Sequence, residues 1–394
     1  MKGDSERGTR RKSALGLGDT LDPMTASGEI PELGDRRSRP TVLPRLESVA
    51  GHSRIIVDGR PRYEQIETLG SGGIGVVELA RDNDIGRKVA VKRLLPEASS
   101  PTDLLRFAEE VRTVGLLEHP NITPIHDVGV DDAGAYFFVM KHVEGMTLEA
   151  IIQRLATGDA DTHARYTFEA RTRIFLGIVQ ALAFAHAKGV VHRDVKPANV
   201  MIGACGEVML VDWGLSTRGT SAIDRPDTIV GTPAYMAPEQ AYGAEKGDER
   251  SDIYSACVLF YELLTLRHYL PDPTNVLETL SAVETHEPVP ARFVVSPHQT
   301  NVPPELSFFV AKGMKKDASE RYQSVTEMLE ALAAIHRGDI RAQCPRTFLK
   351  RMTFRAMHFS DAHAATSLIL TVLAILVFVC GIASVAMWLM SILA

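Results

Sequence analysis

Hydrophobic residues recur at different spacings along the chain, and each spacing predicts a different structure. Residues 1–62 follow neither the helical nor the strand period and mix charges with Gly, Pro, Ser and Thr, so this arm is expected to be disordered. Residues 63–92 are β-rich and alternating, which predicts a strand hairpin, and residues 136–140 predict a further buried strand. Residues 104–117 and 168–188 carry apolar side chains at the helical spacing, so long helices are expected there.

The C-terminal residues show a different pattern, because no charged residue follows Asp361 and residues 367–394 are almost wholly apolar. As a helix, this run of about 28 residues would measure about 42 Å, which exceeds the roughly 30 Å hydrocarbon core of a bilayer. A buried core helix does not fit that length, so residues 366–393 are predicted to span a membrane. Basic residues precede the span and place that flank in the cytoplasm: Arg346, Lys350, Arg351 and Arg355.

Composition narrows the class of protein. At 394 residues the chain is longer than a usual single domain. Its net charge of −6 is the opposite of the basic charge that nucleic-acid-binding proteins carry, so no nucleic acid partner is expected. The N-terminus lacks the apolar core of a secretory signal. The four cysteines form no CxxC pair and have no histidine at zinc-ligand spacing, so free thiols are expected at Cys205, Cys257, Cys344 and Cys380.

A glycine-rich bend lies inside the first predicted hairpin, with glycines at 70, 72 and 75. Glycine lets the backbone approach a phosphate group closely, since a Cβ would collide there. Dinucleotide-binding proteins share the GxGxxG pattern, but in them a helix follows it, whereas a strand follows here and carries Lys92. An ammonium among apolar residues needs an acidic partner, and both Glu109 and Glu110 are candidates. The alternative is that both acids only solvate their helix.

Two short motifs carry residues suited to phosphoryl transfer, which is catalysed by positioning and charge neutralisation. The run HRDVKPAN begins at His192, and the triplet DWG begins at Asp212. Asp194 can orient a hydroxyl nucleophile and Lys196 can meet the transferred phosphoryl group. Asn199 and Asp212 can hold a metal ion. An HRD triplet alone is equally typical of a surface turn.

Together, and in this order with GTPAYMAPE ending at Glu239, the motifs resemble the eukaryotic-like, bacterial-type Ser/Thr protein kinases over residues 63–335. The resemblance implies an α+β, bilobal protein-kinase fold, with a β-rich N-lobe and an α-rich C-lobe, plus one C-terminal transmembrane helix. Four parts are expected along the chain: a disordered arm at 1–62, a kinase domain at 63–336, a basic juxtamembrane linker at 337–365 and the transmembrane helix at 366–393.

The resemblance also implies roles for the site residues. Asp194 and Lys196 would be catalytic, Asn199 and Asp212 would hold Mg2+, and Lys92 paired with Glu110 would hold the ATP phosphates. The full set expected to bind ATP is Leu69, Gly70, Ser71, Gly72, Gly73, Ile74, Gly75, Val76, Val77, Ala90, Lys92 and Glu110.

Further residues match structural positions of the family or depart from them. Glu239 is expected to pair with Arg321, and Asp252 is expected to brace the catalytic loop. The departures are Ile74 for an aromatic residue, Lys141 for an acid, Trp213 for phenylalanine and Cys257 for glycine.

The function implied is a Ser/Thr protein kinase that transfers the γ-phosphate of ATP to protein hydroxyls in membrane-associated signalling. Protein substrates are expected, together with dimerisation for trans-autophosphorylation, single-pass insertion in the inner cell membrane and a cytoplasmic kinase domain. Autophosphorylation is expected in the activation segment, chiefly at Thr228 with Arg193 receiving the phosphate, among the hydroxyls Ser216, Thr217, Thr220, Ser221 and Thr228. The alternatives are a kinase-like nucleotide-binding scaffold without catalysis, or a small-molecule kinase.

Overall fold

The computed structural model describes residues 41–43, 45–49, 52–56, 60–72, 75–96, 100–218, 232–241, 247–271, 275–339 and 343–393. Gly73, Ile74, Thr220, Ser221 and Thr228, as well as residues 1–40, lie outside these ranges.

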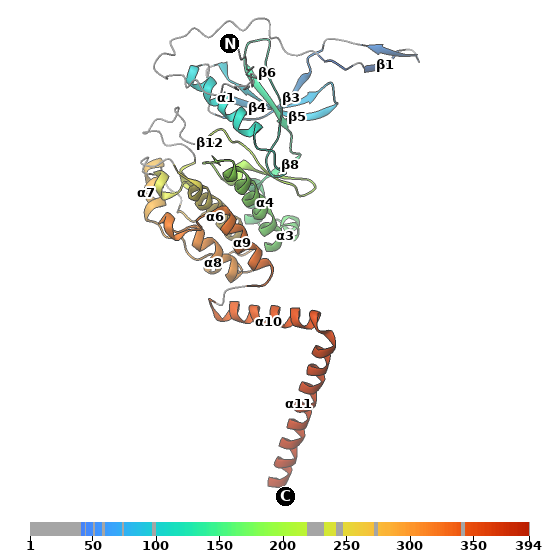
Figure 1. Ribbon diagram of the computed structural model, residues 1–394, viewed down its shortest axis with the longest axis vertical. Coiled ribbons are helices and arrows are strands. Elements are labelled where there is room, and N and C mark those ends of the chain that lie inside the picture. The colour runs from blue at the N-terminus through green and yellow to red at the C-terminus, as the bar shows by residue number, and fades with distance from the viewer. Residues whose placement is uncertain are drawn as a thin grey trace, which may run out of the picture. The chain divides into compact units, whose positions relative to one another are not determined.

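The N-terminal lobe, at the top of Figure 1, contains an antiparallel sheet. The sheet has five strands in the order β3-β4-β5-β7-β6. Its strands are β3 (Tyr63–Ser71), β4 (Gly75–Asp82), β5 (Arg87–Leu94), β6 (Ile125–Val130) and β7 (Tyr136–Lys141). Helix α1 (Pro101–Gly115) packs on one face of the sheet, where Phe107 contacts Phe138 with ring centroids 5.5 Å apart. Val91 and Val139 pack on the other face, as the alternation of the strands requires.

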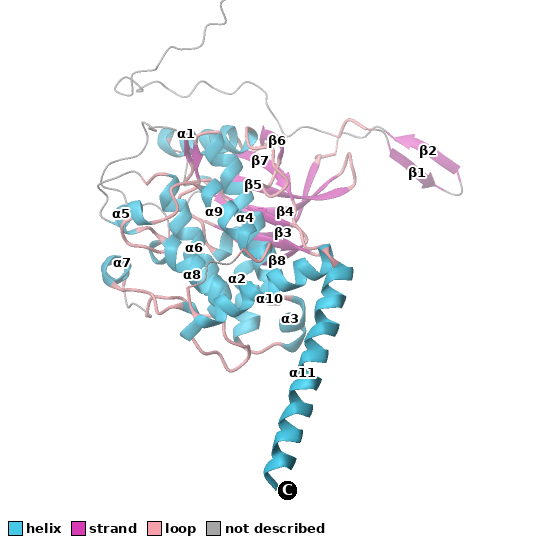
Figure 2. Ribbon diagram, turned by 60° about the horizontal axis from the view of Figure 1, so that its bottom comes forward, coloured by secondary structure: helices cyan, strands magenta, loops and turns pink. Residues whose placement is uncertain are grey.

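The C-terminal lobe is mainly helical (Figure 2). Its core forms where α4 (Phe168–Ala187) and α6 (Glu249–Thr265) meet, with Phe175 stacked on Phe260 at 4.0 Å. Thr167 and Asp248 start these two helices, because each side chain accepts a hydrogen bond from a free N–H of the first turn. The surrounding helices are α2 (Leu148–Ala156), α3 (Ala160–Arg165), α5 (Pro238–Ala241), α7 (Val276–Thr285), α8 (Pro304–Gly313) and α9 (Val325–His336).

Short strands frame the loops between these helices. Strand β10 (Val200–Gly203) pairs with β8 (Gly145–Thr147) and β11 (Val208–Leu210), and β9 (Val190–Val191) pairs with β12 (Thr217–Arg218). These pairings hold both ends of the HRD loop and the start of the segment after DWG. The β-rich and α-rich lobes confirm the predicted fold class.

Two further helices follow the kinase domain. Helix α10 (Pro345–Ala362) is separated from α11 (Ala364–Leu393) by His363, whose backbone is not helical. Within the described residues, one helix is long and apolar enough to cross a membrane, over Thr366–Val385, and none of that stretch is buried. The expected linker at 337–365 therefore contains a regular helix.

A hairpin of β1 (Arg45–Val49) and β2 (His52–Ile56) forms in the N-terminal arm, for which the sequence predicts disorder. The sequence pattern did not predict this hairpin, because strands of five residues are too short to show a clear period.

Candidate active site

The catalytic loop follows β9 and is anchored from beneath by Asp252 in the first turn of α6. The Asp252 carboxylate accepts hydrogen bonds from the backbone N–H groups of His192 and Arg193 and from Nε2 of His186, each at 2.8 Å. Burial alone would raise the pKa of Asp252, but the hydrogen bond from His186 and those from the loop hold it below its ordinary value. The predicted brace is present, and it fixes where the next residue, Asp194, lies.

The backbone is strained at two points of the site. Arg193 has φ 67° and Asp212 has φ 58°, both in the left-handed region that non-glycine residues rarely adopt. Such conformations persist where the surrounding structure enforces them, and they gather at functional sites.

Asp194 is buried and lies at the centre of a polar cluster. Its Oδ2 is 2.7 Å from Nζ of Lys196 and 3.0 Å from the amide nitrogen of Asn199. Its Oδ1 accepts hydrogen bonds from the backbone N–H of Thr232 at 3.0 Å and from the Thr232 hydroxyl at 2.9 Å. Lys196 also donates to the Thr232 hydroxyl at 2.7 Å, so these three side chains form one connected network.

Lys92 reaches across from β5 to two acids. Its Nζ is 2.6 Å from Oε1 of Glu110 and 3.2 Å from Oδ1 of Asp212. Burial alone would lower the pKa of Lys92, but the charges of Glu110 and Asp212 raise it above its ordinary value, so the ammonium stays charged. Glu110 is buried while Glu109 is exposed, which resolves the choice between the two acids in favour of Glu110.

The glycine-rich bend lies between β3 and β4. The N–H of Gly72 donates to the carbonyl of Gly75 at 2.8 Å, and a Cβ on Gly75 would lie 2.9 Å from the carbonyl oxygen of Arg93. A side chain at Gly75 is therefore excluded by backbone, whereas Gly70 has open space around it.

The other described residues of the predicted ATP set follow the same strands. Gly70 and Ser71 pair with Val77 and Val76 across the hairpin, and Val77 pairs with Lys92 on β5. Ala90 is buried, and Leu69 is partly exposed. The structure thus brings these residues together along one hairpin and the strand beside it.

Asn199 and Asp212 supply oxygen ligands of the type that Mg2+ prefers. The amide nitrogen of Asn199 bonds to Asp194, at 2.8 Å to its carbonyl oxygen, which leaves the Asn199 side-chain oxygen for a cation. Partial burial alone would raise the pKa of Asp212, but the ammonium of Lys92 holds it below its ordinary value. In the described residues no group of three or more His, Cys, Asp or Glu side chains is placed to hold a metal ion. A site of one carboxylate and one amide fits a metal that shares its shell with substrate phosphates and water.

Trp213 and His186 carry structural roles beside this site. Trp213 is fully buried, and its ring contacts the ring of His192 at a centroid distance of 4.4 Å. Its indole N–H donates to the carbonyl of Leu210 at 3.4 Å. His186 was not singled out from the sequence; its place in the last turn of the helix before HRD is the signal that could have found it.

Glu239, which ends the APE motif, forms the predicted ion pair with Arg321 in the C-terminal lobe. The guanidinium donates to both carboxylate oxygens, at 2.8 and 2.7 Å, and the Arg321 side chain is fully buried. Cys257 fills the space beside Gly313, where an added Cβ would lie 2.1 Å from its sulfur. The departure from glycine at 257 is thus matched by a glycine opposite.

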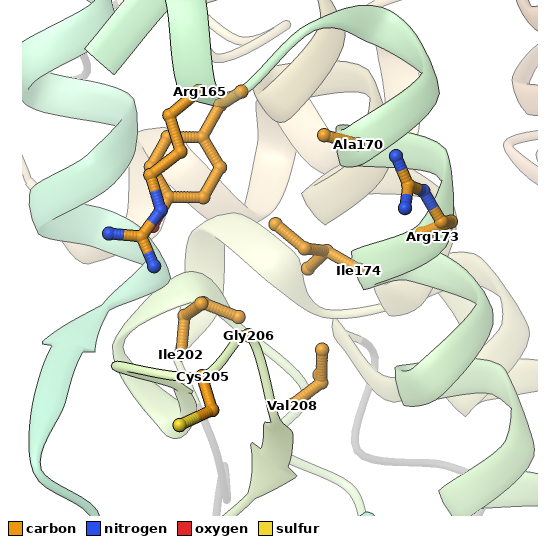
Figure 3. Close-up of a pocket in the computed structure, with 9 residues that line it drawn as sticks. Arg165, Ala170, Arg173, Ile174, Ile202, Cys205, Gly206 and Val208 are labelled. Atoms are coloured by element: carbon orange, nitrogen blue, oxygen red, sulfur yellow. The ribbon is translucent and has the colours of Figure 1, made fainter. Parts of the chain in front are cut away.

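A separate cavity of about 290 Å³ lies among α3, α4, β10 and β11. Figure 3 shows Arg165 and Arg173 on opposite sides of this cavity, with Cys205 on the turn that joins β10 to β11. None of the predicted site residues lines it, so it is distinct from the catalytic cluster.

A β-rich lobe carrying a glycine bend and a lysine–glutamate pair, joined to a helical lobe carrying the HRD and DWG loops, defines a protein kinase domain. The chain belongs to the protein kinase domain family, which it matches over residues 63–333.

Among curated proteins, the chain is 36% identical over 275 residues to a probable serine/threonine-protein kinase of Streptomyces coelicolor, covering 68% of this chain and 39% of that protein. It is 35% identical over 292 residues to the serine/threonine-protein kinase PknD of Protochlamydia amoebophila, covering 68% and 29%. It is 36% identical over 285 residues to the serine/threonine-protein kinase PknB of Mycolicibacterium smegmatis, covering 70% and 43%. The chain thus spans less than half the length of these relatives.

Proposed function

We propose that this protein is a membrane-anchored Ser/Thr protein kinase that transfers the γ-phosphate of ATP to hydroxyl groups of protein substrates. The observation that carries the proposal is the network of Asp194, Lys196 and Thr232 beside the Lys92, Glu110 and Asp212 cluster. Serine/threonine kinases among the relatives support the same substrate hydroxyl.

In the proposed reaction, the hydroxyl oxygen of the substrate forms a bond to the γ-phosphorus of ATP. The bond from that phosphorus to the β–γ bridging oxygen breaks, and ADP leaves. Asp194 orients the hydroxyl and accepts its proton, while Lys196 neutralises charge on the transferred group. Lys92, held by Glu110, positions the α- and β-phosphates. Asn199 and Asp212 would hold Mg2+, which neutralises phosphate charge when bound.

Two alternatives are less well supported. A nucleotide-binding scaffold without catalysis usually lacks one of Lys92, Asp194 and Asp212, whereas all three are present and contact their expected partners. A small-molecule kinase would not need Thr232 and the APE segment, which the protein-directed branch uses to bind a peptide.

We also propose that α11 anchors the protein in the membrane as a single span. Its apolar surface supports this, since the stretch Thr366–Val385 exposes large apolar side chains that water would disfavour. The basic residues before it support a cytoplasmic kinase domain.

The substitution Asp194→Asn tests the catalytic proposal. The full chain in detergent with labelled ATP and Mg2+ should lose at least about 10²-fold in phosphoryl transfer, the low end for loss of a general base, while ATP binding is retained. Asp161→Asn, at an exposed position on α3, is the matched control and should transfer phosphate at the wild-type rate. Undiminished transfer by Asp194→Asn would show that the chain uses another base or another chemistry.

A further inference from the structure

Helix α10 lies along one side against α8 and against Gly338, which follows α9. Thr347 is 1% exposed, and Phe354 lies against Gly338, where an added Cβ would be 2.6 Å from the ring. Lys350 forms an ion pair with Glu305 of α8, whose side chain is only 5% exposed. These contacts hold the helix in one rotational setting, so its other side has a defined composition.

The other side exposes large apolar side chains. Phe348, Leu349, Met352 and Phe359 are 57%, 65%, 51% and 46% exposed. At about 100° per residue, they fall within a stripe about 100° wide, centred roughly opposite Thr347 and Phe354. This set of four residues is called the apolar stripe below. Exposure of such an apolar stripe to water is unfavourable, so another surface is expected to cover it.

Two neighbouring features indicate what covers the stripe. Arg346 and Arg351 flank it with positive charge, which suits anionic lipid headgroups. The predicted membrane span begins only a few residues after Phe359, about 10 Å of helix away, at Thr366. The helical backbone is interrupted at His363, with φ −135° and ψ 56°, so α10 is not a continuation of the span.

We propose that α10 lies in the membrane–water interface of the anionic bilayer that α11 enters. The apolar stripe packs among the acyl chains, and Arg346 and Arg351 contact lipid phosphates. Since Lys350 ties α10 to Glu305, the C-lobe is held against the membrane rather than on a free tether. This inference rests on the anchoring role proposed for α11.

The test is quenching of tryptophan fluorescence by brominated lipids, with the full chain reconstituted in vesicles of phosphatidylcholine and phosphatidylglycerol. The chain has two tryptophans, Trp213 and Trp388. Trp213 is buried in the kinase domain, and Trp388 lies on α11 and reports insertion of the anchor. In a Trp388→Phe background, Met352→Trp places a reporter in the apolar stripe. Met357→Trp is the matched control, since Met357 is 66% exposed and about 140° around α10 from Met352.

We expect Met352→Trp to be quenched at least about twofold more than Met357→Trp, and the excess to fall when Arg346 and Arg351 are both changed to Gln. Phosphorylation activity at the wild-type level in each variant would show that the fold is kept.

If Trp388 of the wild type is quenched while the two reporters are quenched equally, the anchor stands and the interfacial helix is refuted. If Met352→Trp is shielded from lipid and cross-links between two chains, a second copy covers the stripe and the proposal is also refuted. If Trp388 is not quenched but Met352→Trp is, α10 binds the bilayer surface and the anchor is wrong.

Discussion

Glu110 and the adjacent Glu109 have the same side chain, but Glu110 is buried and Glu109 is exposed. The two residues therefore separate the effect of position from the effect of residue type. Glu110 holds Lys92 at 2.6 Å, and Lys92 in turn lies 3.2 Å from Asp212. A Cβ at Gly214 would lie 3.2 Å from Oε2 of Glu110, so a side chain there would press on the same carboxylate. The position of the ammonium, and with it the proposed phosphate clamp, depends on this one carboxylate.

We therefore predict that Glu110→Gln lowers phosphoryl transfer by at least about 10-fold, because the clamp loses its charge-assisted bond. Glu109→Gln should leave the rate within about twofold of wild type, as expected for an exposed side chain. Both rates are measured with labelled ATP on the full chain. Equal losses in the two variants would mean that the clamp is not the cause.

The pair of Glu239 and Arg321 predicts a pH dependence of stability. Burial alone would raise the pKa of Glu239, but the hydrogen bonds and charge of Arg321 hold it below the ordinary value of 4.5. A lowered folded-state pKa contributes stability that is fully present above pH 4.5 and is lost as the pH falls through the lowered value.

Glu239→Gln should accordingly lower the free energy of unfolding by about 3 kcal/mol at pH 7, since the buried Arg321 charge loses its partner. The difference from wild type should shrink as the pH falls below 4.5, because Glu239 is protonated first in the unfolded chain and then, at its lowered pKa, in the folded protein. Urea unfolding at several pH values measures this. A difference that stays constant down to pH 3 would contradict the assigned cause.

At the scale of elements, α10 and the segment after DWG are attached to the rest of the fold in different ways. Residues 217–218 pair with β9 before the chain passes out of the described residues, and Thr232 bonds to Asp194 where it returns. Helix α10 is attached by the contact of Phe354 with Gly338 and by the ion pair of Lys350 with Glu305.

We predict that activation depends on Thr228, which stands four residues before Thr232. A phosphate there adds about −1.5 to −2 charges and would pair with Arg193 beside the catalytic base. Thr228→Ala should reduce activity towards added substrate more than Thr217→Ala, Thr220→Ala or Ser221→Ala, with ATP binding retained. Equal activity of Thr228→Ala and wild type after full autophosphorylation would rule the mechanism out.

Loss of the ion pair should loosen α10. Lys350→Met leaves the carboxylate of Glu305 buried without its cation, so we expect hydrogen exchange of amides in residues 345–362 to speed up about tenfold, or about 1.4 kcal/mol. The measurement is made in detergent without anionic lipid, where Arg346→Met, at an exposed position on the same helix, is the control and should exchange at the wild-type rate. Unchanged exchange in Lys350→Met would show that the apolar contacts alone hold α10.

At the scale of the whole molecule, the kinase domain has its own core, formed mainly by α4 and α6, and none of the α11 side chains that the structure describes belongs to it. Deleting residues 362–394 should therefore leave an active kinase that is no longer integral to the membrane and that stays in solution when no anionic lipid is present. The full chain should fractionate with membranes and resist extraction by high salt, which removes proteins held by charge alone. Recovery of the intact chain in the soluble fraction would refute the anchor.

The sequence alone determined the features that depend on local chemistry. Alternating strands, helical periods and the apolar C-terminal run follow from side-chain polarity, and they predicted the β-rich lobe, the helical lobe and the long last helix. The HRD and DWG motifs name Asp194, Asn199 and Asp212, because phosphoryl transfer needs those groups and each motif is a short run of sequence.

Tertiary structure decided what depends on how elements pack. Glu109 and Glu110 are about 100° apart around their helix, so the rotation of α1 about its axis, as it packs on the sheet, determines which of them contacts Lys92. His186 and Asp252 are far apart in sequence and meet only because α4 and α6 pack together. The apolar stripe of α10 is defined by the tertiary structure, because the burial of Thr347 and the contacts of Phe354 and Lys350 fix which side of the helix is covered. In the sequence alone, the apolar residues of the stripe are interleaved with basic ones.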